Sequence, residues 1–202
     1  TTSKVTQAPF DALGIRGDSR QYSLNLRQPL VRSPRQEFAL SLGFSHTSGQ
    51  TFLFNDLAQP FGFGPDANGR SQVSTLTFGQ QYLSRDSGGA WSFNSEFNLG
   101  VAWLGATVNE APVPDGRFFS WLGQVSRAQR AGDNHLFILQ ADMQLTPDSL
   151  LPSEQFVVGG IGSVRGYRQN LRSGDNGLRL SIEDRVAVSR DSAGRPEVFI
   201  TP

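Results

Sequence analysis

The chain has 202 residues, and its 18 basic residues balance its 18 acidic ones. This balance gives no overall field that would attract nucleic acid or an anionic surface, so no nucleic-acid partner is expected. The chain has no cysteine, which excludes thiolate metal sites, disulfides and thiol nucleophiles. No window reaches the roughly 18 consecutive apolar residues of a membrane helix, and the first residues do not form a signal peptide.

Taken in chain order, most of the sequence alternates apolar and polar residues with a period of two, which predicts β-strands. The alternating segments are 22–26, 38–45, 72–82, 91–101, 119–126, 137–145 and 178–185, and a further segment begins at Glu197 and is cut off by the end of the chain. Each predicted strand has one apolar and one polar face. The polar faces carry charged residues, such as Glu96, Asp142, Arg179 and Glu183, which suits a water-filled lumen.

The connections between these segments alternate between short and long. Short connections are expected at 32–35, 86–89, 130–134 and 191–196, and long ones at 47–70, 105–116 and 146–176. One rim therefore carries tight turns and the other carries extended loops, which is typical of outer-membrane barrels and not of β-sandwiches. We predict an all-β fold, a transmembrane antiparallel β-barrel, with strands missing at both ends because open edges in lipid would leave backbone groups unsatisfied.

The last long connection holds the most specific motif, which reads F-x-x-G-G-x-x-S-V-R-G-Y from Phe156 to Tyr167. This motif resembles the signature loop of the polypeptide-transporting outer-membrane barrels. Together with the stretch Y-S-L-N-L-R-Q-P-L-V-R-S-P at 22–34, it is similar to the two-partner secretion transporters, the haemolysin activation/secretion proteins. The resemblance covers essentially the whole chain, but only the loop is specific.

The resemblance implies that the chain is a fragment, about eight strands of a barrel of about sixteen. It implies one C-terminal barrel domain over 1–202, with residues 1–18 in an extracellular loop and with the periplasmic POTRA domains and the final strands outside this chain. The expected location is the outer membrane of a Gram-negative-type envelope. The expected partners are an unfolded exoprotein, such as a haemolysin or adhesin, and outer-membrane lipid, with a monomeric barrel, no cofactor and no enzymatic activity.

The same resemblance implies that the 156–177 loop tucks into the lumen as a latch. Its motif residues are Gly159, Gly160, Ser163, Val164, Arg165, Gly166 and Tyr167.

The chemistry of these residues suits a latch. The paired glycines allow a sharp turn and close packing, and Gly166 presents no side chain to clash with the lumen wall. The Arg165 guanidinium offers a fixed fork that suits a carboxylate, and Tyr167 would add packing and a hydroxyl contact. Possible lumen-facing polar contacts are Asp142, Glu183 and Arg185. Neither acid is named as the partner of Arg165, because the resemblance implies that this acidic partner lies on a strand beyond Pro202.

Two other functions remain open: a barrel-assembly factor of the same superfamily, and a passive porin. An outer-membrane enzyme would need a convergent catalytic set, and Glu183 and Asp184, as strand neighbours, should face opposite sides.

Other short signals carry less weight. The tripeptide Arg16-Gly17-Asp18 is expected to make a turn before a strand. His46 and His135 are expected to be rim residues without metal-ligand spacing, so no metal site is expected. The tryptophans are expected to be girdle residues at the membrane interface.

Overall fold

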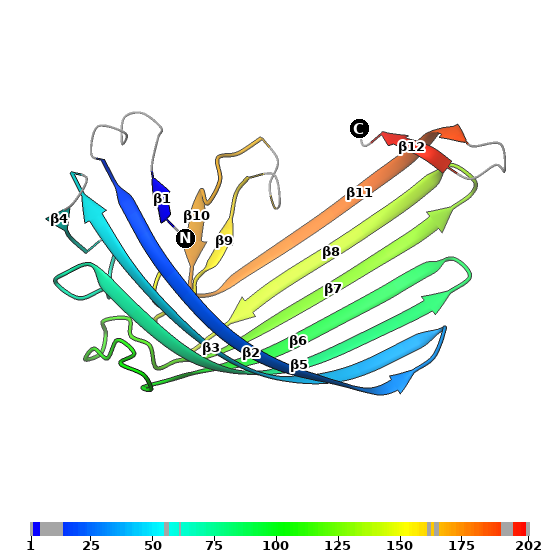
Figure 1. Ribbon diagram of the computed structural model, residues 1–202. Coiled ribbons are helices and arrows are strands. Elements are labelled where there is room, and N and C mark those ends of the chain that lie inside the picture. Colours follow the sequence, from blue (N-terminus) through cyan, green and yellow to red (C-terminus); the bar gives the residue numbers. More distant parts are fainter. Residues whose placement is uncertain are drawn as a thin grey trace.

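The computed structural model describes residues 2–4, 14–54, 57–60, 62–160, 163, 166–190 and 196–200 of the chain. Its strands form one large antiparallel sheet that curls into a trough (Figure 1). A separate two-stranded hairpin stands over the open, concave side of the trough. The predicted all-β antiparallel fold is confirmed.

Seven long strands follow one another across the sheet in chain order and run from 11 to 18 residues. They are β2 (Arg16–Arg32), β3 (Gln36–Leu53), β5 (Arg70–Asp86), β6 (Gly89–Val101), β7 (Phe119–Ala131), β8 (His135–Leu145) and β11 (Gly177–Arg190). Short strands flank them: β1 (Thr2–Lys4) pairs with β2, β4 (Leu57–Ala58) pairs with β3, and β12 (Pro196–Ile200) pairs with β11. The hairpin consists of β9 (Phe156–Val158) and β10 (Arg172–Gly174).

The short–long alternation of connections is confirmed. Residues 33–35, 87–88 and 132–134 make tight turns, whereas 54–69, 102–118 and 146–176 make the long connections. The turns gather at one end of the trough and the long connections at the other (Figure 1). The expected turn at 191–196 begins in 191–195, which lie outside the described residues.

Two predicted boundaries were wrong at the long-connection end. The loop expected to begin at Thr47 begins only after Leu53, because β3 stays hydrogen-bonded in register to both β2 and β5 up to this rim. Residues 16–18, expected in a turn and an extracellular loop, begin β2 and also pair with β1. The alternation that marks a strand fades here since both faces carry polar residues, while the backbone ladder continues.

One face of the sheet is apolar and open to its surroundings. On β11, Leu178, Leu180 and Ile182 are 70%, 65% and 72% exposed, and the other strands present aromatic and aliphatic residues on the same face. Side chains that lie against lipid in a membrane barrel have this arrangement. Within the described residues, no helix has the length and hydropathy needed to span a bilayer.

The opposite face is polar, and it is the concave one. Its residues form rows across paired strands, such as Ser41, Gly79, Glu96, Leu122 and Gln144. The Gln144 side chain donates hydrogen bonds to the carbonyl oxygens of Glu154 (3.0 Å) and Asp175 (2.9 Å). Both acceptors belong to the connection that carries the hairpin over the concave side, so this row faces the inside of the trough (Figure 1).

A small buried core lies among the long connections and not between two sheets. Val73 of β5, Phe118, Leu150 and Leu151 are between 0% and 4% exposed and form what we call the loop core. Gly64, from the preceding long connection, packs so closely that a Cβ atom there would lie 2.6 Å from Leu151 Cδ2. Three long connections therefore pack together over the concave face at one rim.

Candidate functional site

The hairpin of the long connection 146–176 is tied to the sheet near its base. The Asp175 carboxylate accepts hydrogen bonds from the Leu150 amide (3.2 Å) and the Gln155 side chain (3.0 Å). Phe156, at the start of β9, lies directly on Gly177, where a Cβ atom would meet the phenyl ring at 2.1 Å. A side chain at 177 would force the Phe156 ring to move, so glycine allows this close contact between the hairpin base and β11.

The paired glycines begin the turn at the tip of the hairpin. Gly159 and Gly160 have φ values of 121° and 89°, which L side chains rarely adopt. A Cβ atom on Gly159 would lie 2.5 Å from the Arg168 carbonyl oxygen, so the two branches approach each other closely there. The Gly159 amide donates to Ser163 Oγ at 2.7 Å, and the Ser163 amide donates to the Gly160 carbonyl at 3.1 Å. The glycines and the serine of the motif thus build the turn itself.

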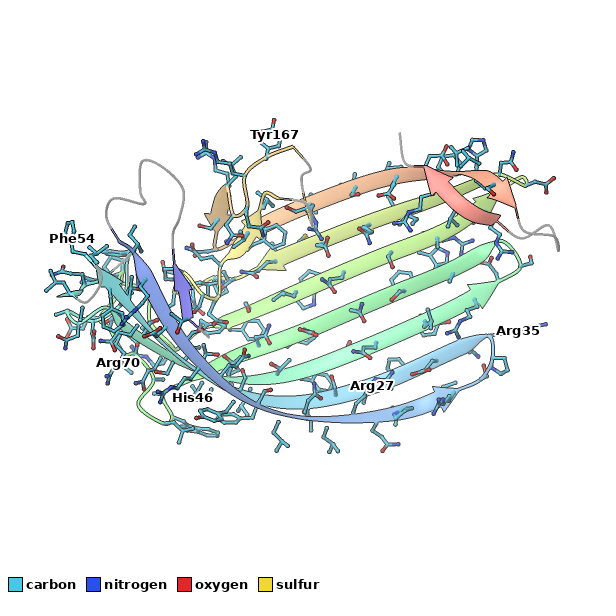
Figure 2. The ribbon with its side chains drawn as sticks, turned by 45° about the horizontal axis from the view of Figure 1, so that its top comes forward. Arg27, Arg35, His46, Phe54, Arg70 and Tyr167 are labelled. Atoms are coloured by element: carbon cyan, nitrogen blue, oxygen red, sulfur yellow. The ribbon has the colours of Figure 1, made fainter. Side chains whose placement is uncertain are left out.

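The remaining motif residues divide into two groups. Val164 and Arg165 lie outside the described residues, so the latch stays a prediction. Gly166 has a φ of 89°, and nothing lies within 4 Å of its Cβ position, so its backbone conformation and not a nearby wall requires glycine. Tyr167 is 61% exposed and points away from the sheet at the top of the hairpin (Figure 2), and its packing contact stays a prediction.

The lumen-facing charges expected from the sequence do share the concave face. Asp142 of β8 accepts a hydrogen bond from Arg179 Nε at 2.8 Å, and these side chains are 13% and 25% exposed. On β11, Arg185 Nε donates to Glu183 Oε1 at 2.6 Å. Asp184, by contrast, faces the apolar side and pairs with His135 at 2.8 Å. The structure therefore separates Glu183 and Asp184 onto opposite faces, as predicted, and engages both inward acids with arginines of the same sheet.

Of the two histidines, only His135 lies at a strand end, as was expected of both. His135 begins β8 beside a tight turn, whereas His46 lies within β3 and contacts Ser74 Oγ at 2.9 Å. In the described part of the chain, no group of three His, Asp or Glu side chains is arranged to hold a metal ion. Trp103 folds from the connection after β6 against Phe44, with ring centroids 6.3 Å apart.

The residues of the connection 146–176 that hold the hairpin in place were not predicted from the sequence. Leu150 and Leu151 are adjacent and so follow no strand period, although the pairing of two large apolar residues in a polar loop is itself a signal of burial. Glu154, in the same connection, sits in a partly buried position, and this burial raises the pKa of its carboxyl group. The carboxyl group also accepts a hydrogen bond from Ser153 Oγ at 3.1 Å.

Comparison with known proteins identifies similar chains. The sequence profile described as "Haemolysin secretion/activation protein ShlB/FhaC/HecB" matches residues 1–183. The chain is 29% identical over 164 residues to an outer membrane transporter, CdiB, from Dickeya dadantii (strain 3937), and 27% identical over 170 residues to CdiB from Escherichia coli O6:K15:H31 (strain 536 / UPEC). These alignments cover 80% and 83% of the chain but only 28% of each relative.

Solved structures agree with this similarity. CdiB from Escherichia coli superimposes with a TM-score of 0.76 at 25% sequence identity, over 93% of this chain and 34% of that one. CdiB from Acinetobacter baumannii, at 21% identity and a TM-score of 0.68, supports the fold over 92% of this chain and 32% of its own. The sheet therefore matches about a third of a larger barrel protein.

Proposed function

This chain belongs to the haemolysin secretion/activation protein family ShlB/FhaC/HecB, and on that basis we propose that its protein exports a partner exoprotein across the outer membrane by two-partner secretion. The family consists of transporters and not enzymes. The chain would be part of the C-terminal barrel, completed by further strands and preceded by periplasmic POTRA domains. The barrel would act as a monomer in contact with outer-membrane lipid.

The observation that carries the proposal is the division of the sheet into two faces. The convex face presents residues such as Leu180 and Ile182 to its surroundings, whereas the concave face carries serines, amides and paired charges. A closed barrel of this kind encloses a hydrated path, along which an unfolded chain can move without leaving water. A haemolysin or adhesin is the expected cargo, and no bond chemistry is needed to move it.

We further propose that Arg165 latches the 156–177 loop inside the lumen. The hairpin stands over the concave side, and its glycine turn brings the two branches close together just before the arginine. Asp142 and Glu183 already bind Arg179 and Arg185. The family resemblance implies that the carboxylate that receives Arg165 lies on a strand beyond Pro202.

The test is export of the exoprotein by the full-length transporter carrying Arg165→Ala, with Arg168→Ala as the matched control. Arg168 is an exposed arginine of the same hairpin. Losing a charge-assisted hydrogen bond of ~1.5–3 kcal/mol should lower secretion by about tenfold or more for Arg165→Ala, with normal amounts of barrel in the membrane. Equal secretion by the two variants would remove the latch role.

A second experiment separates export from the two alternative functions. A passive porin should conduct small ions steadily in planar bilayers whether or not position 165 carries an arginine. A barrel-assembly factor should, when depleted, lower the membrane levels of unrelated barrels. The proposal expects depletion to abolish surface appearance of one exoprotein and leave other barrels unchanged.

A further inference from the structure

The concave face is not uniform, and its most regular part lies on β2 and β3. From Asn25 upward on β2 and from Ser41 upward on β3, every inward-facing position is glycine, serine, threonine, asparagine or glutamine. We call this surface the uncharged wall: Gly17, Ser19, Gln21, Ser23, Asn25, Ser41, Gly43, Ser45, Thr47, Gly49 and Thr51. Its positions pair directly across the two strands, as Ser23 does with Ser45, so the wall is continuous.

Charges mark the lower end of this wall. Arg27, labelled in Figure 2, is the next inward position on β2, and its guanidinium binds the Glu37 carboxylate at 2.5 Å and Gln81 Oε1 at 2.9 Å. Above this pair the wall runs along β2 from Asn25 to Gly17, eight residue steps or about 27 Å at the rise of a strand. The charged residues at the top of β2, such as Arg16 and Asp18, have the opposite parity and face outward.

The loop core bounds the wall on its other side. One row across the sheet joins Gln21, Thr47 and Val73, and exposure falls along it from exposed on β2 to 3% on β5. The next row does the same from Ser23 to Thr75, which is 7% exposed. At the long-connection end, the loop core therefore covers the concave face over β5 and over β6, where Phe118 lies on Gly100, and no described residue of the loop core covers β2 and β3.

We propose that the exported polypeptide crosses the upper lumen along the uncharged wall, between the loop core and the strands that complete the barrel. The inference rests on the proposed export function. An unfolded chain presents charges of both signs and apolar side chains in succession. A wall with lysine, arginine or acids would hold it by charge-assisted hydrogen bonds, and a wall of large apolar residues would hold it by burial.

Short hydroxyls and glycines avoid both kinds of binding. Each hydroxyl can exchange a hydrogen bond with water for one with a passing peptide group at little net gain, so no segment of the cargo is strongly retained. Glycine at 17, 43 and 49 also widens the path by leaving out side chains. The wall gives a sliding surface that tolerates any sequence, and the loop core confines the chain to it.

The path can be tested by site-specific photo-crosslinking in the full-length transporter, with the exoprotein stalled by a stably folded domain fused to its C-terminus. A photo-reactive residue replaces Ser23 or Ser45 in the wall. The matched controls are Asn98 on β6 and Ser120 on β7, which are also inward-facing and polar and lie in one row with Asn25 and Gly43 of the wall. The proposal expects crosslinks to the stalled exoprotein at Ser23 and Ser45 and none above background at the controls.

Crosslinks at the controls alone, at all four positions equally, or at none of them while the exoprotein is demonstrably stalled in the membrane would each overturn the path. If no exoprotein is exported at all by the unmodified transporter, the export function fails instead, so the two failures are distinguishable.

A second set of variants tests the same surface by charge. Ser45→Arg should slow secretion by about tenfold, because one charge-assisted hydrogen bond with the cargo would retain it by that factor. Asn98→Arg, in the same part of the concave face but outside the wall, should leave secretion within about twofold. Both barrels should remain folded, as judged by their heat-modifiable mobility on gels. Equal secretion by the two folded variants would contradict the proposal.

Discussion

Truncating Leu151 should release the long connections without unfolding the barrel. Leu151 is fully buried, and its Cδ2 atom lies close to Gly64 of another connection, so Leu151→Ala leaves a cavity that the neighbouring loops cannot easily fill. Buried leucine-to-alanine changes cost ~2–5 kcal/mol. A loss of about 3 kcal/mol would raise the population of open loops by a factor of about 150.

The assay is limited trypsin cleavage of the full-length transporter in detergent or liposomes, followed at Arg117. Its side chain is 54% exposed and is held by the Asp115 carboxylate at 2.6 Å, close to the loop core. Because cleavage follows the open population when opening and closing are fast, the cleavage rate should rise with that factor. Leu57→Ala, at a residue 54% exposed in β4, serves as the control.

The reasoning would be refuted if Leu151→Ala and Leu57→Ala were cleaved at Arg117 at the same rate. It would also fail if Leu151→Ala destroyed the heat-modifiable barrel, because the loop core would then be part of barrel folding and not a separate unit.

The remaining predictions concern the hairpin, its base and the inner charges. Burial raises the pKa of Glu154, so the folded loop holds this proton more tightly than the unfolded chain does. The stability of the loop should therefore fall as pH rises from the pKa of the unfolded chain, near 4.5, through the higher pKa of the folded loop. Glu154→Gln should remove this pH dependence, as measured by the rate of proteolysis of the loop at several pH values. Gly159→Ala should cost ~1–3 kcal/mol in backbone strain plus the clash with the Arg168 carbonyl, whereas Gly166→Ala meets open space and carries the strain alone. Amide hydrogens over 156–174 should therefore exchange faster in Gly159→Ala than in Gly166→Ala, and equal exchange rates would contradict this reasoning. Asp142→Asn removes the charge that binds Arg179 on a half-buried surface and should cost about 1 kcal/mol, read as a lower temperature of heat modification; an unchanged temperature would mean that the pair adds nothing to stability.

The strands and their order could be predicted from the sequence, but the packing of the long connections could not. Alternation located the strands because each of their side chains lies on either the apolar or the polar face of the sheet. At Thr47 and at Arg16 that contrast disappears, since both faces carry polar residues, and the strand ends could not be read from polarity. The loop core depends on contacts between connections far apart in the chain, as between Gly64 and Leu151, which no local pattern encodes.

The hairpin shows a similar division. The glycine pair predicted a sharp turn from its own backbone chemistry, and the turn is present. The role of Asp175 as the acceptor that ties Leu150 and Gln155 to the hairpin base was not foreseen, because an aspartate in a glycine-rich loop has many possible partners. The proposed latch needs an acceptor carboxylate for Arg165, and no pattern within this chain identified that carboxylate.

Cysteine accessibility in the full-length transporter tests the two-faced sheet most directly. This chain has no cysteine of its own, so single cysteines at Ser181 and Ile182, with any others in the protein replaced, report one position each. A membrane-impermeant thiol reagent should label Ser181→Cys rapidly in intact membranes and leave Ile182→Cys unlabelled until detergent exposes it. Labelling of Ile182→Cys while Ser181→Cys stays protected would place water on the apolar face, and neither a hydrated lumen nor an exported chain within it would remain tenable.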